Sequence, residues 1–180
     1  LAKWANGMPG GPDNPLGVGA GAGTDEPNIL ATLGGDGSIA LWDLDGAGPI
    51  AQVLPGFDEW AAGLAVSPDG RTLAVISCFG EVSLWDLELL QPLGNLAESP
   101  APAGCTQRQS VAFSHNGAML AAGFADGSIE VINLADHSID NRFPGTGSTI
   151  MTLGFSADDS MLVSLDQSAA LSFWTLGTGD

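Results

Sequence analysis

The chain has 180 residues, of which 44% are hydrophobic, so it is long and apolar enough to bury one sizeable core. Its 21 acidic residues against four basic ones give a net charge of −17, which excludes nucleic-acid binding through a basic surface. Its apolar runs are far shorter than the roughly 18–20 residues of a membrane-spanning helix, so we expect a soluble, cytoplasmic protein without membrane insertion.

Short apolar runs alternate along the chain with Asp-Gly, Asn-Gly, Pro-Gly and Gly-Gly pairs, a pattern that predicts β-strands joined by tight turns. The first expected strand lies near 18–22, where a glycine-rich stretch would weaken it. The clearest unit follows, with strands expected at 50–54, 62–66, 72–77 and 82–86. The same succession of strands and turns continues to residue 176.

One sequence motif occurs four times without a gap, at 30–44, 73–87, 120–134 and 162–176, with spacings of 43, 47 and 42 residues. A second shared block precedes the last three copies, at 64–70, 111–117 and 153–159. Each unit therefore predicts a small antiparallel sheet of four strands, which we letter d, a, b and c in chain order, so that 50–54 is a strand d and 82–86 a strand c. Such a sheet has two apolar faces and cannot bury either alone, so we expect the units to stack.

The motifs resemble those of the WD40 repeat family over residues 14 to 176. The resemblance rests on Leu-Trp-Asp-Leu at 41–44 and 84–87, on the Ser-Pro-Asp-Gly turn at 67–70, on the Asp-Gly-Ser turns at 36–38 and 126–128, and on the repeat spacing. It implies an all-β fold, a WD40-type β-propeller with about four four-stranded antiparallel blades. The expected repeats are 14–48, 49–91, 92–137 and 138–180, preceded by a tail or outer strand at 1–13.

The resemblance also implies that about seven or eight blades close such a ring, so four repeats would form a partial, open ring. The start at Leu1 and the end just after a strand c lead us to expect part of a larger propeller. The apolar faces of the two end blades would then be covered by further repeats, by a partner protein or by a second copy.

Blades of this family are often pinned by a buried network of a strand-c tryptophan, a strand-b hydroxyl, an aspartate of the b–c turn and a histidine of the d–a loop. The histidine is missing from every unit here, and Thr146 stands in its place in the fourth unit. In the second unit Phe57 and Phe79 replace the histidine and the aspartate, so we expect their rings to touch. Ile132 replaces the third tryptophan. The residues with expected structural roles are Trp42, Trp85, Trp174, Asp36, Asp126, Phe57 and Phe79, and we expect the three tryptophans to be largely buried.

No motif indicates catalysis, a cofactor or a metal site. His115 and His137 fall in turns on one rim, and no Ser, His and Asp arrangement is signalled. Cys78 and Cys105 lack a CxxC spacing, and we expect two free thiols, with a disulfide between them as the alternative.

The expected binding surface is the top rim, where the resemblance places the d–a loops and the b–c turns. The third unit is longer than the others, and its excess lies in the d–a loop at 97–105. Binding residues concentrate on loops over a rigid scaffold, and an aromatic side chain beside acids would suit a basic peptide with an apolar anchor. The candidates are Asp58, Glu59, Trp60, Pro100, Pro102 and Arg108, although Trp60 could instead cap the core.

These observations favour a non-catalytic, rigid scaffold for protein–protein interaction within a larger assembly. One alternative is a structural domain packed permanently against other domains. Another is an enzyme with an active site in the central channel.

Overall fold

The computed structural model describes residues 18–20, 29–34, 38–43, 48–51, 61–98 and 109–177. Within these ranges the chain forms fifteen strands and no helix. The strands make four antiparallel sheets, which we call blades 1 to 4. Blade 1 holds β1 (Val18–Ala20), β2 (Ile29–Leu33), β3 (Ile39–Asp43) and β4 (Gly48–Ala51); blade 2 holds β5 (Ala61–Val66), β6 (Thr72–Ser77), β7 (Glu81–Asp86) and β8 (Gln91–Glu98); blade 3 holds β9 (Ser110–Phe113), β10 (Met119–Gly123), β11 (Ile129–Asn133) and β12 (Ile139–Phe143); and blade 4 holds β13 (Ile150–Phe155), β14 (Met161–Asp166) and β15 (Leu171–Thr175).

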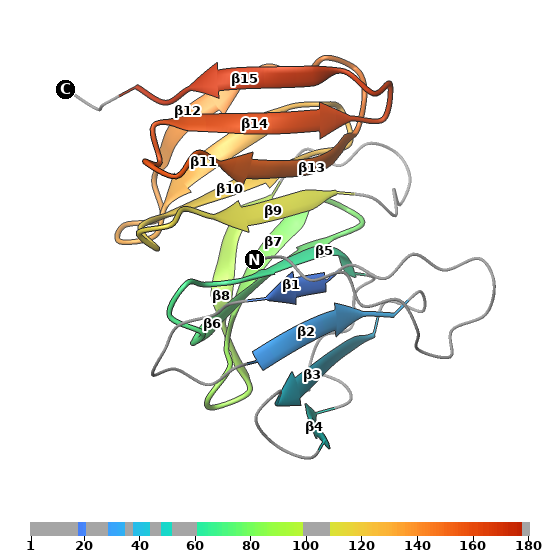
Figure 1. The fold of residues 1–180 in the computed structure, drawn as a ribbon, viewed down its shortest axis with the longest axis vertical. Coiled ribbons are helices and arrows are strands. Elements are labelled where there is room, and N and C mark those ends of the chain that lie inside the picture. The colour runs from blue at the N-terminus through green and yellow to red at the C-terminus, as the bar shows by residue number, and fades with distance from the viewer. Residues whose placement is uncertain are drawn as a thin grey trace.

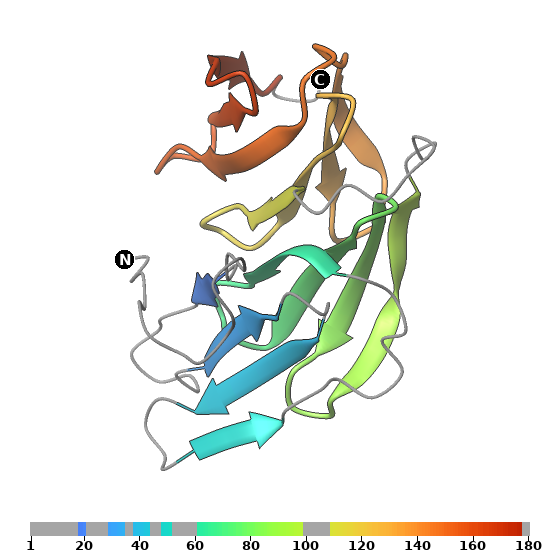
Figure 2. The same ribbon diagram turned by 90° about the vertical axis from the view of Figure 1, so that its right-hand side faces the viewer.

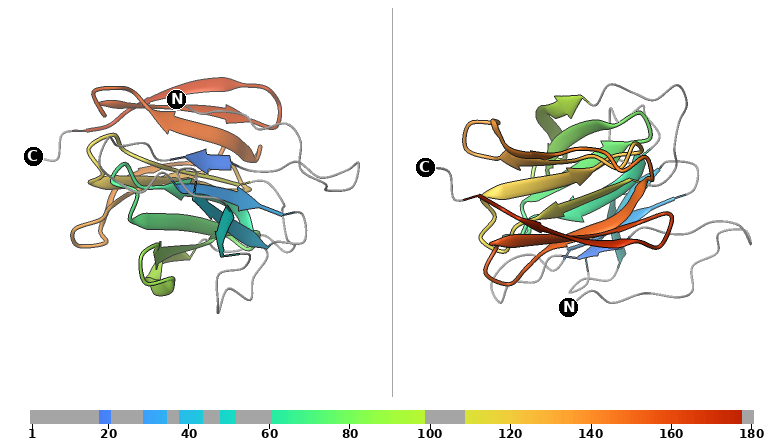
Figure 3. Two further views of the ribbon diagram at one scale, coloured as in Figure 1. Left: turned by 60° about the horizontal axis from the view of Figure 1, so that its bottom comes forward. Right: turned by 90° about the horizontal axis from the view of Figure 1, so that it is seen from above.

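The blades stack in chain order, with blades 1 and 4 at opposite ends of the molecule (Figure 1). The strands a, which are β1, β5, β9 and β13, contact one another in succession. The outer strands spread apart (Figure 2). Both views in Figure 3 show blade 4 as the outermost sheet at its end. The described blades therefore form an open stack rather than a closed ring, which confirms the expected all-β, propeller-type fold.

Strand pairing repeats the same register in every blade. The first leucine of each aligned motif pairs with the strand-c position of the tryptophan, in the pairs Leu30–Trp42, Leu73–Trp85, Leu120–Ile132 and Leu162–Trp174. The predicted strands b and c of the second unit match β6 and β7 to within one residue. Alternating residues of a strand point to opposite faces, so each central strand contributes to two interfaces.

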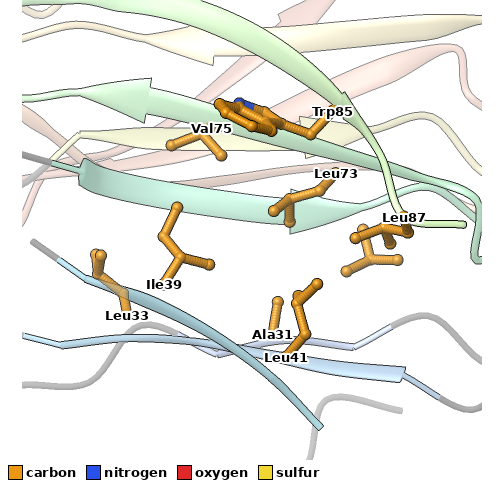
Figure 4. Packing of buried hydrophobic residues seen from close by; sticks show 9 residues of the cluster. Ala31, Leu33, Ile39, Leu41, Leu73, Val75, Trp85 and Leu87 are labelled. Atoms are coloured by element: carbon orange, nitrogen blue, oxygen red, sulfur yellow. The ribbon is translucent and has the colours of Figure 1, made fainter. Parts of the chain in front are cut away.

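The cores lie between blades, not within them. Figure 4 shows the first of them, in which Ala31, Leu33, Ile39 and Leu41 of blade 1 face Leu73, Val75, Trp85 and Leu87 of blade 2. In blade 2, the positions equivalent to these four residues of blade 1 are buried against blade 3. They are Ala74, Ile76, Val82 and Leu84. A third cluster joins blades 3 and 4. Each blade therefore presents the same four positions to the blade that follows it.

In blade 4 two of those positions are half-buried and two are exposed. They are Val163, Leu165, Leu171 and Phe173, and Leu171 is 58% and Phe173 63% exposed. Because the described part of the chain holds no sheet beyond blade 4, this end face is apolar and open.

The three strand-c tryptophans occupy equivalent positions but differ in burial. Trp85 is only 3% exposed between blades 1 and 2, as expected. Trp42 and Trp174 are partly exposed, so their burial is less complete than expected. Trp42 lies on the outer face of blade 1, and Trp174 lies on β15, the edge strand among the described strands of blade 4.

Candidate protein-interaction surface

All six predicted binding residues, Asp58, Glu59, Trp60, Pro100, Pro102 and Arg108, lie outside the described residues, and their placement stays a prediction. The predicted structural residues Asp36 and Phe57 also lie outside, so the Phe57–Phe79 contact is not tested. Phe79 itself is half-exposed. The described part of the top rim consists of the b–c turns of blades 2 to 4 and the d–a loop at 144–149.

Each b–c turn of blades 2 to 4 is closed by a polar side chain, but not always from the same position. In blade 3 the Asp126 carboxylate accepts hydrogen bonds from the Ser128 amide at 2.9 Å and hydroxyl at 2.6 Å. In blade 2 the Ser77 hydroxyl oxygen accepts from the amides of Phe79 and Glu81, both at 3.2 Å. The turn aspartate is thus dispensable when an acceptor stands two residues before its place.

Blade 4 uses the same alternative. The Asp166 carboxylate accepts from the amides of Ser168 at 2.9 Å and Ala170 at 3.0 Å, and from the Ser168 hydroxyl at 2.6 Å. The Ser168 hydroxyl and these amides hold the pKa of Asp166 below its usual value. Sequence reasoning missed Ser77 and Asp166, although the signal was present. They occupy the same position in the aligned repeats, and this position is polar only in the two units that lack the turn aspartate.

The loop at 144–149 is latched to the blades on both sides. The Thr149 hydroxyl donates to the Ala125 carbonyl at 3.0 Å, and the Gly147 amide donates to the Asp126 carbonyl at 2.8 Å, both in blade 3. On the other side, the Ser168 amide of blade 4 donates to the Ser148 hydroxyl at 3.2 Å.

The approach of this loop to blade 3 is close. A Cβ on Gly145 would lie 2.5 Å from the Asp126 carbonyl oxygen. Thr146 stands where the family often has histidine, and it also lies against the b–c turn of blade 3. A Cβ built on Gly127 of that turn would be 2.5 Å from the Thr146 hydroxyl oxygen. The loop is therefore packed closely against the b–c turn of blade 3.

An equivalent latch joins blades 2 and 3. The buried Gln109 side chain donates from Nε2 to the Cys78 carbonyl at 3.0 Å, and Cys78 aligns with Ala125. Cys78 is also disulfide-bonded, so the expectation of a free thiol is wrong. The only other cysteine of the sequence is Cys105, outside the described residues. The latch holds Gln109, four residues after position 105 in the sequence, against the b–c turn of blade 2 that contains Cys78.

The opposite rim carries a second link between blades. Asp159 stands where the a–b turns of blades 2 and 3 have Gly70 and Gly117, and it shares their positive φ. Its carboxylate accepts from the amides of His115 at 2.8 Å and Asn116 at 3.0 Å and lies 3.0 Å from the His115 Nδ1. Burial alone would raise the pKa of Asp159, but the hydrogen bonds from His115 and Asn116 hold it below its usual value.

The two histidines are exposed turn residues on this rim, as expected. A pocket of about 500 Å³ opens between blades 2 and 3 on the same side of the molecule, lined by residues of the a–b turns, of β8 and of the c–d turn of blade 3. Among the described residues, no group of three His, Cys, Asp or Glu side chains could hold a metal ion. The described part also contains no helix capable of spanning a membrane.

Comparison with known proteins gives one family model, "WD domain, G-beta repeat", which matches residues 106–133. WD repeat-containing protein 1 of Bos taurus is 33% identical over 125 residues, which are 68% of this chain and 20% of that protein. The WD repeat-containing protein VIP3 of Arabidopsis thaliana is 30% identical over 154 residues, 80% of this chain and 47% of that protein. Protein groucho of Drosophila melanogaster is 26% identical over 157 residues, 85% of this chain and 21% of that protein.

The chain thus spans less than half of the length of each of these relatives. The family model covers part of one repeat, and the same register recurs in all four described sheets. Together these findings confirm that the chain carries repeats of the WD40 family.

Proposed function

We propose that this chain is a non-catalytic WD40 propeller segment that serves as a rigid scaffold for protein–protein interaction, with the top rim as its binding surface. The observation that carries the proposal is the double latch of the d–a loop. Thr149 and Gly147 fix the loop to blade 3, and Ser148 fixes it to blade 4. A loop ordered before binding costs less conformational entropy when a partner docks.

Charge supports a basic partner. The net charge is −17, and the candidates Asp58 and Glu59 add two carboxylates beside Trp60 on the predicted rim. Electrostatic complementarity of this kind speeds association and selects among partners, while an aromatic anchor supplies affinity.

A permanently packed structural domain is the second candidate, and one observation favours it. Leu171 and Phe173 expose an apolar end face that a neighbouring domain would bury. The two functions place the partner on different surfaces, so they can be separated by experiment.

The test compares two triple variants of the full chain in a binding assay on cell extract. The rim variant carries Asp58→Ala, Glu59→Ala and Trp60→Ala. The matched control carries Glu88→Ala, Asp140→Ala and Leu89→Ala, which also remove two acids and one large apolar side chain but from exposed positions on the opposite rim. Circular dichroism and thermal unfolding verify that both variants keep the fold.

We expect the rim variant to lose the proteins that the unmodified chain captures and releases at raised salt, and the control to retain them. Equal retention by both variants would contradict the top-rim assignment. Loss of binding only when Leu171 and Phe173 are replaced would favour the structural domain.

A further inference from the structure

One aligned position of the b–c turns carries a different kind of side chain in each of blades 2 to 4. Blade 3 has Asp126 there, whose carboxylate accepts a hydrogen bond from the Ser128 hydroxyl at 2.6 Å. Blade 4 has Ser168, whose hydroxyl donates to the Asp166 carboxylate at 2.6 Å. Both side chains thus help to close their turns. Blade 2 instead has Phe79, whose side chain has no hydrogen-bonding group, so the position has lost its polar role there.

The b–c turn of blade 2 is closed without the Phe79 side chain. The Ser77 hydroxyl oxygen accepts hydrogen bonds from the amides of Phe79 and Glu81, and the Ser77 carbonyl accepts one from the Gly80 amide at 3.0 Å. Gly80 supplies the left-handed backbone of the turn, with a φ of 88°. The conformation of the turn therefore does not explain why an aromatic residue stands at its tip.

The residues on both sides of Phe79 are fixed, while Phe79 itself faces water. Cys78 is buried and disulfide-bonded, and its carbonyl accepts a hydrogen bond from the Gln109 Nε2 at 3.0 Å. Gly80 is also buried. Phe79 between them is 47% exposed. An aromatic side chain with two rotatable bonds on a fixed turn loses little conformational entropy when a partner covers it.

Phe79 differs in its place from the other exposed large hydrophobic residues of the described chain. Those lie on outer strands, on the c–d turn of blade 2 or on the end face of blade 4, and they are Leu89, Leu93, Ile139, Leu171 and Phe173. Among the described b–c turns and the loop at 144–149, Phe79 is therefore the one large apolar side chain that the top rim exposes.

The charges around Phe79 favour a basic partner. Glu81 follows it by two residues, and the exposed Asp126 lies on the b–c turn of the next blade. The described residues include two arginines. Arg71 lies in an a–b turn on the opposite rim, and Arg142 forms an ion pair with Glu130 at 2.8 Å. The described part of the top rim is therefore negative, which attracts and orients a cationic segment.

We propose that Phe79 is the apolar contact residue of the top rim, and that it binds the large apolar side chain of a basic segment in a partner protein. The lysines or arginines that flank this side chain face Glu81 and Asp126. The proposal rests on the function proposed for the top rim, and it adds a residue outside the predicted set together with the chemistry of the partner segment.

The test is a nuclear magnetic resonance titration of the ¹⁵N-labelled 180-residue chain with the tripeptide acetyl-Lys-Trp-Lys-amide. We expect saturable shifts of the amides of Phe79, Gly80 and Glu81. Acetyl-Lys-Ala-Lys-amide and acetyl-Glu-Trp-Glu-amide should each bind about tenfold more weakly, because each lacks one of the two recognised groups.

Variants of Phe79 separate its binding role from the fold of the turn. Phe79→Ser introduces the residue that blade 4 has at this position, so the turn should form as before while binding weakens about tenfold. Phe79→Trp should keep the affinity within about twofold. Phe79→Leu keeps a smaller apolar side chain and should weaken binding about threefold, which keeps the test decisive if Phe79→Ser does not fold. Leu89→Ser is the matched control, since Leu89 is 63% exposed on the c–d turn of the same blade, and its binding should be unchanged.

Three results would overturn the proposal. They are unchanged binding by a folded Phe79→Ser or Phe79→Leu chain, equal binding of the alanine peptide, and an absence of shifts at Phe79 and Gly80. Shifts confined to Gly127, Ser168 and the loop at 144–149 would reject Phe79 but leave the top rim as the binding surface. The extract assay with the Asp58, Glu59 and Trp60 variant decides that function independently, so the two failures are distinguishable.

Discussion

Replacing Trp85 by alanine should remove much of the stability of the core between blades 1 and 2. Trp85 is 3% exposed and packs with Leu73 and Val75 against blade 1 (Figure 4). A buried tryptophan covers about 200 Å² of apolar surface, which at about 25 cal/mol per Å² corresponds to about 5 kcal/mol before the smaller area of alanine is subtracted. Measured losses for such truncations are about 3–5 kcal/mol, and we expect a value in that range.

Trp42 is the matched control. It has the same register as Trp85, and its indole donates to the Thr32 hydroxyl at 3.0 Å, but it lies on the outer face of blade 1 and is partly exposed. Because less apolar area leaves water at this site, Trp42→Ala should cost about half as much as Trp85→Ala or less.

The assay is urea denaturation of both variants, followed by far-ultraviolet circular dichroism because the substitutions alter the fluorescence. The midpoint and the slope are compared separately, since a stack of blades can unfold in stages. A loss below about 1 kcal/mol for Trp85→Ala would refute the interblade core, because no buried aromatic side chain of this size is replaced so cheaply. Equal losses for the two variants would refute the assignment of Trp42 to an end face.

Four further predictions concern the links between blades and the exposed end face of blade 4. Asp159→Asn should lower the free energy of unfolding by about 1 kcal/mol by weakening the hydrogen bonds to His115 and Asn116, as measured by urea denaturation at neutral pH. Folding lowers the pKa values of Asp69, Asp159 and Asp166, so these groups stabilise the folded chain fully above the ordinary carboxylate pKa of about 4. Their contribution should be lost as the pH falls through the pKa values of the folded state. A rise in the free energy of unfolding on acidification would contradict this. Thiol titration of the denatured chain without reductant should find no free cysteine, and two titratable thiols would contradict the bond. Reduction or Cys78→Ser should each lower the free energy of unfolding by about 3–4 kcal/mol, as for a closed loop of about 27 residues. Leu171→Glu with Phe173→Glu should reduce concentration-dependent association of the isolated chain in sedimentation velocity while changing stability by less than about 0.5 kcal/mol, whereas unchanged association would show that the end face is not adhesive.

The strands and their register were predictable because both follow from local patterns. Short apolar runs and Gly-containing turns defined β6 and β7, and the aligned motifs placed Trp42, Trp85 and Trp174 at equivalent positions. Such patterns need only one strand and its neighbours to be read correctly. The repeat boundaries themselves stay predictions.

Features that depend on neighbouring blades were less predictable. The burial of Trp42 and Trp174 depends on which sheets cover them, and the bonded state of Cys78 depends on a cysteine far from it in the sequence. The acceptors Ser77 and Asp166 could be found only by comparing two positions of the aligned repeats: the position of the turn aspartate and the position two residues before it.

The predicted binding residues lie outside the described ranges, in segments that the sequence predicts to be loops, and no local pattern specifies the conformation of a loop. Their assignment rests on the alignment with the family, and binding alone can test it.

Hydrogen exchange of the chain with and without a captured basic partner tests the central claim most directly. If the top rim is the binding surface, bound partner should slow exchange of amides in the b–c turns at 124–128 and 166–170 and in the loop at 144–149, and leave the opposite rim at 134–138 unchanged. Slower exchange confined to the opposite rim or to the end face of blade 4 would contradict the account.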